Sequence, residues 1–200
     1  MTGSTTARGI VVGVTGASGA AYARRLIQCL CAQDAHVHLV ITPCGRRLLR
    51  DELGMDEPTA AWFAGGDDAP ITIYPHEDVG AGIASGSFIT DGMIVCPCSG
   101  NTLGAIAAGL GDNLLRRAAA VTLKEGRRLI LVPREMPVSQ IDLRNALRLS
   151  EAGAIICPAS PGFYMRPKTV DDLVDFVVGK LLDLLNVPHT LNTRWAEHDG

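Results

Sequence analysis

The stretch Arg128-Leu129-Ile130-Leu131-Val132-Pro133-Arg134-Glu135 decides the fold, because an apolar run is followed at once by a cation and a carboxylate. An uninterrupted apolar run of this length predicts a strand buried on both faces, as in a parallel sheet. Arg134 and Glu135 then stand at the carboxyl end of that strand, where open α/β sheets bind ligands. Taken alone, the pair is more simply interpreted as a salt bridge at a strand end.

Working outward from this stretch, apolar runs alternate with segments of helical period along the whole chain. The predicted strands are Ile10–Thr15, Val37–Thr42, Ile71–Tyr74, Met93–Cys96, Leu129–Val132 and Ala154–Cys157. The predicted helices lie near Gly19–Ala32, Arg46–Leu53, Asn101–Ala108, Asp112–Glu125, Ser139–Ala152 and Val170–Leu185. This alternation predicts a Rossmann-like (flavodoxin-like) α/β fold, a doubly wound parallel sheet with helices on both faces.

Length and composition predict one ordinary globular domain. A chain of 200 residues with 47% hydrophobic and 20% charged residues fills a single core, which we place over residues 9–187, with 188–200 as a tail or interface arm. The acidic, glycine-rich stretch from 55 to 70 is predicted as a surface loop. A net charge of −3 gives no support to a nucleic-acid or membrane partner. Because no early apolar run is long enough for a signal or spanning helix, we expect a cytoplasmic protein.

The cysteine and histidine patterns do not predict a metal site. None of the six cysteines has C-x-x-C spacing, and several lie in or beside apolar strands, so buried unreactive thiols are expected. His36 and His38 share one face of a predicted strand, where packing is the simpler interpretation because no third ligand lies nearby.

The loop Gly13-Val14-Thr15-Gly16-Ala17-Ser18-Gly19 joins the first strand to the first helix. Small residues there let backbone N–H groups approach a phosphate, although a tight turn would use the same residues. Dinucleotide binding would need an acidic side chain at the end of the second strand, which instead reads Val40-Ile41-Thr42-Pro43. A mononucleotide such as FMN is therefore favoured.

Two hydroxyl-rich turns flank the fourth strand. Ser85-Gly86-Ser87-Phe88 precedes it and Pro97-Cys98-Ser99-Gly100-Asn101-Thr102 follows it, and we expect both to face one helix N-terminus. Helix capping explains Ser99 and Thr102 as well as ligand binding does. We also expect Lys124, at the end of a helix, to lie beside the Arg134 loop.

In their order along the chain, these motifs resemble flavin prenyltransferases, the UbiX-like enzymes that build prenylated FMN for partner decarboxylases. The resemblance runs from about Gly9 to Trp195. Its most specific parts are Thr15-Gly16-Ala17-Ser18-Gly19-Ala20, Ala84-Ser85-Gly86-Ser87-Phe88, Pro97-Cys98-Ser99, Asp112-Asn113-Leu114, Leu123-Lys124-Glu125, Pro133-Arg134-Glu135 and Pro161-Gly162-Phe163-Tyr164.

The resemblance implies transfer of a dimethylallyl group from dimethylallyl phosphate to N5 and C6 of reduced FMN, without a metal. The residues implied to hold FMN are Gly16, Ala17, Ser18, Thr42, Ser99, Gly100, Asn101, Thr102 and Arg134. Those implied to hold the prenyl phosphate are Ser87, Lys124, Arg134, Tyr164 and Lys180. Those implied in catalysis are Glu135, Glu52, Ser18 and Lys124.

The resemblance also implies an assembly, a partner and some departures from the family pattern. It implies a homo-oligomer, a dodecamer in the family, whose product passes to a UbiD-like decarboxylase. This chain has Lys180 where the family usually has arginine, Thr42-Pro43 where it has serine-lysine, and Val79 where some members carry an aromatic residue.

Two other functions remain open. An FMN-dependent cysteine-type decarboxylase has a similar fold but would need a histidine base at the flavin, for which His76 is the nearest candidate. The other is a non-catalytic flavin-carrying accessory subunit of an aromatic-acid decarboxylase.

Overall fold

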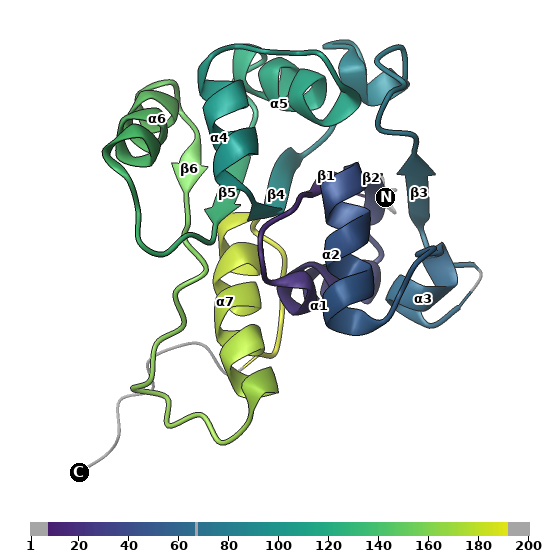
Figure 1. Cartoon of the computed structure of the whole chain (residues 1–200). Coiled ribbons are helices and arrows are strands. Elements are labelled where there is room, and N and C mark those ends of the chain that lie inside the picture. Colours follow the sequence, from purple (N-terminus) through teal and green to yellow (C-terminus); the bar gives the residue numbers. More distant parts are fainter. Residues whose placement is uncertain (1–7, 67, 192–200) are drawn as a thin grey trace, which may run out of the picture.

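A computed structural model describes residues 8–66 and 68–191 of the chain (Figure 1). Six parallel strands form one sheet in the order β3-β2-β1-β4-β5-β6. The strands are β1 (Gly9–Val14), β2 (His36–Ile41), β3 (Ile71–Tyr74), β4 (Gly92–Cys98), β5 (Leu129–Pro133) and β6 (Ile155–Ile156). This order reverses direction between β1 and β4, which places the topological switch point at the carboxyl ends of those two strands.

Helices cover both faces of the sheet. They are α1 (Ala20–Cys31), α2 (Pro43–Leu53), α3 (Ala60–Ala64), α4 (Gly100–Ala107), α5 (Leu114–Lys124), α6 (Gln140–Glu151) and α7 (Val170–Leu184), with a 3-10 turn η1 (Gly82–Ala84). Figure 1 shows α4, α5 and α6 above the sheet and α1, α2 and α7 below it.

Alternate residues of each strand enter two separate cores. Ile10, Val12 and Val14 of β1 point into a core shared with α1 and α7, whereas Val11 lies in a second core with α4 and α5. This alternation is the two-residue period of a strand whose two faces are both buried. The predicted Rossmann-like fold with helices on both faces is therefore confirmed.

All six predicted strands and six predicted helices are present, with boundary shifts of a few residues. One prediction was wrong, because the stretch expected to be a surface loop contains α3. Thr59 caps α3 by accepting from the Trp62 N–H, and Phe63 is fully buried against the first core. A five-residue helix with one core anchor is too short to produce a helical hydrophobic period in the sequence.

The single-domain assignment, with a core over 9–187 and a tail over 188–200, stays a prediction. Residues 192–200, which include Trp195, lie outside the described part of the chain. Before them, His189 Nε2 lies 3.2 Å from Asp183 Oδ1, and Leu191 packs against the first core. Within residues 8–66 and 68–191, no helix has the length and apolarity needed to cross a bilayer.

His36 and His38 lie side by side on β2, as their spacing predicts, with ring centroids 4.7 Å apart. Their partners belong to the neighbouring strand: His36 Nε2 is 2.8 Å from Thr72 Oγ1, and His38 Nδ1 is 3.0 Å from the Tyr74 hydroxyl. Burial, together with the smaller effect of the neighbouring His36, lowers the pKa of His38 from 6.5 to about 4. His38 is therefore a neutral structural residue at physiological pH.

We predict that His38 makes the fold sensitive to acid. Because the pKa of His38 is about 4 in the folded chain and 6.5 unfolded, the unfolded state takes up its proton first as pH falls below 6.5. The free energy of unfolding should fall between pH 6.5 and 4 by roughly 1.4 kcal/mol per pH unit from this group. Urea unfolding of His38→Gln should lack that component, and His76→Gln should retain it. Equal pH dependence in wild type and His38→Gln would contradict the prediction.

Candidate functional site

The buried hydroxyl of Thr15 joins the two central strands at their carboxyl ends. Thr15 Oγ1 donates to the Pro97 carbonyl at 2.8 Å and accepts from the Ser99 N–H at 2.8 Å. The side chain is 1% exposed, so these bonds form away from water, where an unpaired partner is costly. The loop after β1 and the start of α4 are therefore held in one fixed arrangement.

The second loop of the site is drawn against the first by two glycines. Thr42 caps α2 by accepting from the Gly45 N–H at 3.0 Å, and its own N–H donates to the Val14 carbonyl at 3.0 Å. A Cβ at Gly45 would clash with the Val14 carbonyl, and one at Gly16 would lie 2.5 Å from Cys44 Cβ. Both positions require glycine for this close backbone approach.

Glu52 caps the N-terminus of α1. Its carboxylate accepts from the Gly19 N–H at 3.1 Å and from the Ala20 N–H at 2.8 Å. Gly19 has a φ of 128°, which side-chain-bearing residues rarely adopt. The family resemblance implies that Glu52 stands near the reacting bond. In the structure its carboxylate lies at the start of α1, beside the exposed Ser18.

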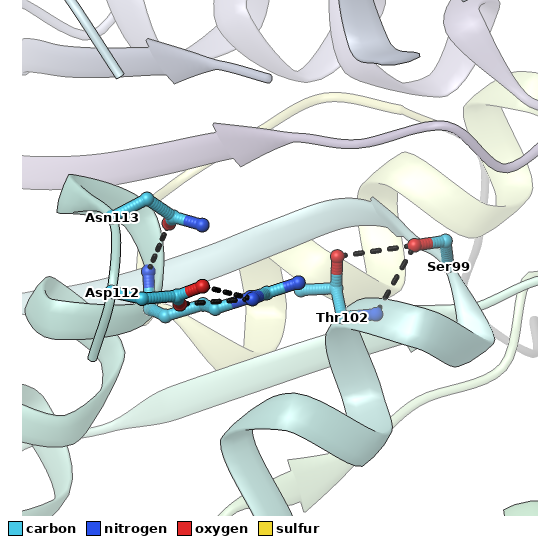
Figure 2. Close-up of polar contacts among 5 residues, drawn as sticks. Ser99, Thr102, Asp112 and Asn113 are labelled. Atoms are coloured by element: carbon cyan, nitrogen blue, oxygen red, sulfur yellow. Dashed lines mark hydrogen bonds and ion pairs between the residues drawn. The ribbon is translucent and has the colours of Figure 1, made fainter. Parts of the chain in front are cut away.

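The turn after β4 is a helix cap that also borders the site. Ser99 caps α4, since its hydroxyl accepts from the Thr102 N–H at 3.3 Å and donates to Thr102 Oγ1 at 3.1 Å (Figure 2). Gly100 and Asn101 form the first turn of α4, and Asn101 is exposed.

The Asp112-Asn113-Leu114 motif has a structural role at the start of α5. Asn113 caps the helix by accepting from the Arg116 N–H at 3.1 Å, and both Asp112 oxygens lie 2.9 Å from Arg116 Nη1. This bond to the guanidinium lowers the pKa of Asp112. The Arg116 side chain is only 15% exposed, whereas that of its partner Asp112 is 61% exposed.

Arg134 and Glu135 follow β5 at the same edge of the sheet. Arg134 Nε is buried and has no hydrogen-bond partner among the described residues, which is unusual for a guanidinium. The Glu135 carboxylate lies close to the first turn of α4, where a Cβ at Gly100 would be 3.7 Å from Glu135 Oε2. A cavity of about 160 Å³ between α4 and α6 is lined mainly by apolar side chains, together with Gly100 and the acidic residues Glu135 and Asp142.

Lys124 does not lie beside Arg134 within one chain, contrary to the expectation from sequence. Helix α5 runs antiparallel to the strands: it starts near the end of β3, where the Leu114 N–H donates to the His76 carbonyl at 2.8 Å, and it ends before β5 begins. Lys124 therefore lies at the amino edge of the sheet, a strand length of about 15 Å from Arg134. Ser87 precedes β4 and Ser99 follows it, so these two residues lie at opposite edges of the sheet and the Ser87 turn does not face the turn at Ser99.

Ser87 and Lys124 belong to one cluster at that amino edge. Lys124 Nζ is 3.4 Å from Glu125 Oε1, and the same oxygen packs where a side chain on Gly86 would otherwise stand. The Ser87 hydroxyl is 2.9 Å from the Ser85 hydroxyl. Ser87 and Lys124, two of the five residues that the resemblance assigns to the prenyl phosphate, thus lie on one surface, which is separate from Arg134.

Tyr164, in the segment between β6 and α7, and Lys180 of α7 form a third group. The Tyr164 ring meets Phe176 edge to face, with centroids 5.5 Å apart, and Lys180 follows one helical turn later on the same side of α7. Burial raises the pKa of Cys157 at the end of β6, and the charge of Lys180 opposes this rise, which places Lys180 near that strand end. Figure 1 shows the segment between β6 and α7 extending beyond the sheet.

Most cysteines are buried or half-buried, as expected. Burial raises the pKa of Cys31 to about 11 and that of Cys98 to about 12. Cys44 is the exception, because it is exposed at the start of α2 beside Gly16. Among the described residues, no three metal-ligating side chains gather at one point.

Two structural contacts were not predicted from the sequence. They are the hydrogen bonds of the Thr15 hydroxyl to Pro97 and Ser99, and those of the Arg127 guanidinium to the Phe88 and Gly86 carbonyls. A threonine at a strand end and an arginine in a turn carry no distinctive pattern. Their partners lie 82 and about 40 residues away along the chain, so only tertiary structure reveals them.

A hydroxyl- and glycine-lined edge at the switch point of a Rossmann-like sheet, with the buried, unpartnered Nε of Arg134 on the adjacent strand end, is typical of α/β proteins that bind a phosphate-bearing nucleotide.

Comparisons with known proteins narrow this class. The sequence profile of the family described as Flavoprotein matches residues 2–182. The flavin prenyltransferase UbiX of Halalkalibacterium halodurans is 51% identical over 191 residues, covering 93% of this chain and 92% of that protein. The enzyme of the same name from Pseudomonas aeruginosa is 42% identical, with 94% of each chain covered.

Solved structures agree with these relatives. AnUbiX in complex with FMN and dimethylallyl pyrophosphate matches with a TM-score of 0.88 and 39% identity, covering 97% of this chain and all of that one. A dodecameric FMN-dependent UbiX-like decarboxylase from Escherichia coli O157:H7 matches with a TM-score of 0.85 and 43% identity, covering 94% and 99%. The chain belongs to the Flavoprotein family and, within it, to the UbiX flavin prenyltransferases.

We predict that Thr15→Val separates the loop after β1 from the turn after β4. The change leaves the Pro97 carbonyl and the Ser99 N–H buried without this partner, at a cost of about 1–3 kcal/mol in the free energy of unfolding. FMN affinity, measured by flavin fluorescence titration, should fall about tenfold. The matched control is Thr122→Val, which removes another buried hydroxyl bonded to a carbonyl, on α5. An unchanged FMN affinity in Thr15→Val would show that the tie does not shape the site.

Proposed function

We propose that this chain is a flavin prenyltransferase that joins the dimethylallyl group of dimethylallyl phosphate to N5 and C6 of reduced FMN, giving prenylated FMN. The observation that carries the proposal is the buried, unpartnered Arg134 Nε after β5, next to the switch-point strand β4, in a chain whose relatives are UbiX enzymes. An anionic ligand would give this guanidinium nitrogen the hydrogen-bond partner that the described residues do not supply.

The residues at the carboxyl edge fit FMN. Gly16 and Ser18 are exposed on the first loop, and Thr42 and Ser99 place hydroxyls on the two adjacent loops. Ala17, Gly100, Asn101 and Thr102 complete the assignment made by resemblance, with Thr102 buried and Asn101 exposed. When bound and reduced, FMN supplies the electron-rich nitrogen and carbon to which the prenyl group is joined.

The donor phosphate would be bound by Arg134, Lys124, Lys180, Tyr164 and Ser87. As the allylic C–O bond breaks, negative charge accumulates on the departing phosphate, and fixed cations lower the barrier by stabilising that charge. Lys180 supplies one charge without the paired hydrogen bonds of the arginine usual in the family.

Glu135 is the proposed proton-transferring group. Its exposed carboxylate is held after β5 beside the N-terminus of α4, next to the apolar cavity. A carboxylate so placed can accept a proton from the reacting flavin position or exchange one with the phosphate. Glu52 and Ser18 stand at the start of α1, where Glu52 fixes the Gly19 backbone.

Anaerobic incubation with reduced FMN and dimethylallyl phosphate, followed by mass analysis of the flavin, tests the function. We expect the mass of one added dimethylallyl group. Glu135→Gln should bind FMN normally but form product at least about a hundredfold more slowly, the usual contribution of a positioned acid or base. An unchanged flavin mass with wild type, with both the mono- and diphosphate donors, would refute the function. Normal turnover by Glu135→Gln would refute only this residue's role.

The proposed enzyme is a homo-oligomer whose subunits share each site. Lys124 and Arg134 lie at opposite edges of one sheet, so a site that uses both must draw them from different chains. An apolar surface suited to such contacts surrounds α6, where Met136 is 86% exposed and Ile141 is 71% exposed, with Val138, Leu143 and Leu147 beside them. A dodecamer, the state named for the Escherichia coli relative, fits this arrangement.

Mixed oligomers test the shared site. Lys124→Ala and Arg134→Ala chains should each be inactive, whereas co-expressed mixtures should regain about a quarter of wild-type activity, because random assembly creates some sites with both residues intact. The control mixture pairs Arg134→Ala with Glu135→Gln, whose residues lie on the same loop of one chain. Failure of the first mixture to exceed the control would show that each chain carries its own complete site.

We further propose that the product serves a UbiD-like decarboxylase and that the protein acts in the cytoplasm. The support is the family itself, whose product is a cofactor for another enzyme. The alternative of a cysteine-type decarboxylase is less well supported, because its candidate base His76 follows the edge strand β3, which β2, β1 and β4 separate from β5 and the Arg134 loop.

A further inference from the structure

The turn between α5 and β5 holds the loop that carries Ser87. Arg127 Nη1 donates to the Phe88 carbonyl at 2.7 Å, and Arg127 Nη2 donates to the Gly86 carbonyl at 2.5 Å. One partly buried guanidinium thus binds two carbonyls that flank Ser87. These bonds join segments about 40 residues apart and fix the loop from outside.

Glu125, in the same turn, adds a second contact to this loop. Its Oε1 packs directly against Gly86, where any side chain would collide with it, and it lies 3.4 Å from Lys124 Nζ. The Ser87 hydroxyl is held in turn by Ser85 at 2.9 Å. The turn of residues 125–127 therefore contacts both the Ser87 loop and Lys124.

We propose that Arg127 is a positioning residue for the donor phosphate. This inference rests on the proposed function, which assigns Ser87 and Lys124 to that phosphate. Arg127 does not touch the donor, because its guanidinium is directed at the two carbonyls. Its planar, rigid fork fixes the spacing of those carbonyls, and thereby holds the Ser87 loop against the turn that follows Lys124 before the donor arrives.

The neighbouring arginine provides a matched control. Arg128 lies next to Arg127 and also donates to a carbonyl, but its partner is Leu184 of α7 at 2.6 Å. Arg127→Gln and Arg128→Gln therefore remove the same charge from adjacent positions, and only the first detaches the Ser87 loop. Arg127→Lys keeps the charge but replaces the two separate guanidinium nitrogens that reach the two carbonyls with a single nitrogen.

The test measures binding of dimethylallyl phosphate to protein loaded with oxidised FMN, by calorimetric titration. We expect Arg127→Gln to weaken donor binding about tenfold and Arg127→Lys to weaken it nearly as much. FMN affinity should stay within about twofold in both, and Arg128→Gln should match wild type. Hydrogen exchange of the 86–88 amides should be faster in Arg127→Gln and unchanged in Arg128→Gln.

A double-mutant cycle checks the route of action. If Arg127 acts through the Ser87 loop, Ser87→Ala should weaken donor binding in wild type and have little further effect in Arg127→Gln. Additive losses would overturn the inference, as would equal donor affinity in Arg127→Gln and wild type, or equal losses in Arg127→Gln and Arg128→Gln. Wild type that binds no donor and leaves the flavin unchanged would instead refute the proposed function, and the donor role of Arg127 with it.

Discussion

The tie made by the Thr15 hydroxyl is the interaction on which the rest of the site depends. It joins β1, which leads to the glycine loop and α1, to β4, which leads to the cap of α4. These are the two strands between which the winding of the sheet reverses, so their loops diverge and leave a crevice. Thr42 and the close approach of Gly45 to Val14 then bring the third loop to the same edge. A ligand placed there meets three loops with fixed relative positions.

The polarity of a parallel sheet separates the remaining groups. Every crossover helix must run antiparallel to the strands, so residues at a helix C-terminus lie at the amino edge, away from the strand-end loops. Lys124 follows this rule, and so does the Ser87 loop that precedes β4. A chain that needs these groups and Arg134 in one reaction can combine them only between subunits. The apolar surface around α6 then acquires a functional reason, since assembly completes the site as well as burying that surface.

The charged groups at the start of α1 and after β5 differ in whether the protein itself pairs them. At the start of α1 the protein supplies its own anion, because Glu52 accepts from Gly19 and Ala20. After β5 it supplies a cation without an anion, because Arg134 Nε has no partner in the described chain. The first arrangement stabilises a loop and the second leaves a place for a charged ligand. Three other arginines have structural partners: Arg127 and Arg128 donate to carbonyls, and Arg116 pairs with Asp112.

The sequence alone determined the order and kind of the main elements, because continuous apolar strands and amphipathic helices follow local periodicities that the fold preserves. It also located the glycine loop, the cap at Ser99 and the Arg134-Glu135 pair, whose signals lie within a few residues. It missed α3, whose one buried anchor, Phe63, makes no period. Only the tertiary structure decided that Thr15 ties two strands, that Arg127 holds the Ser87 loop, and that Lys124 lies far from Arg134. These facts depend on which edge of the sheet each segment reaches, and no local pattern of residues encodes that position.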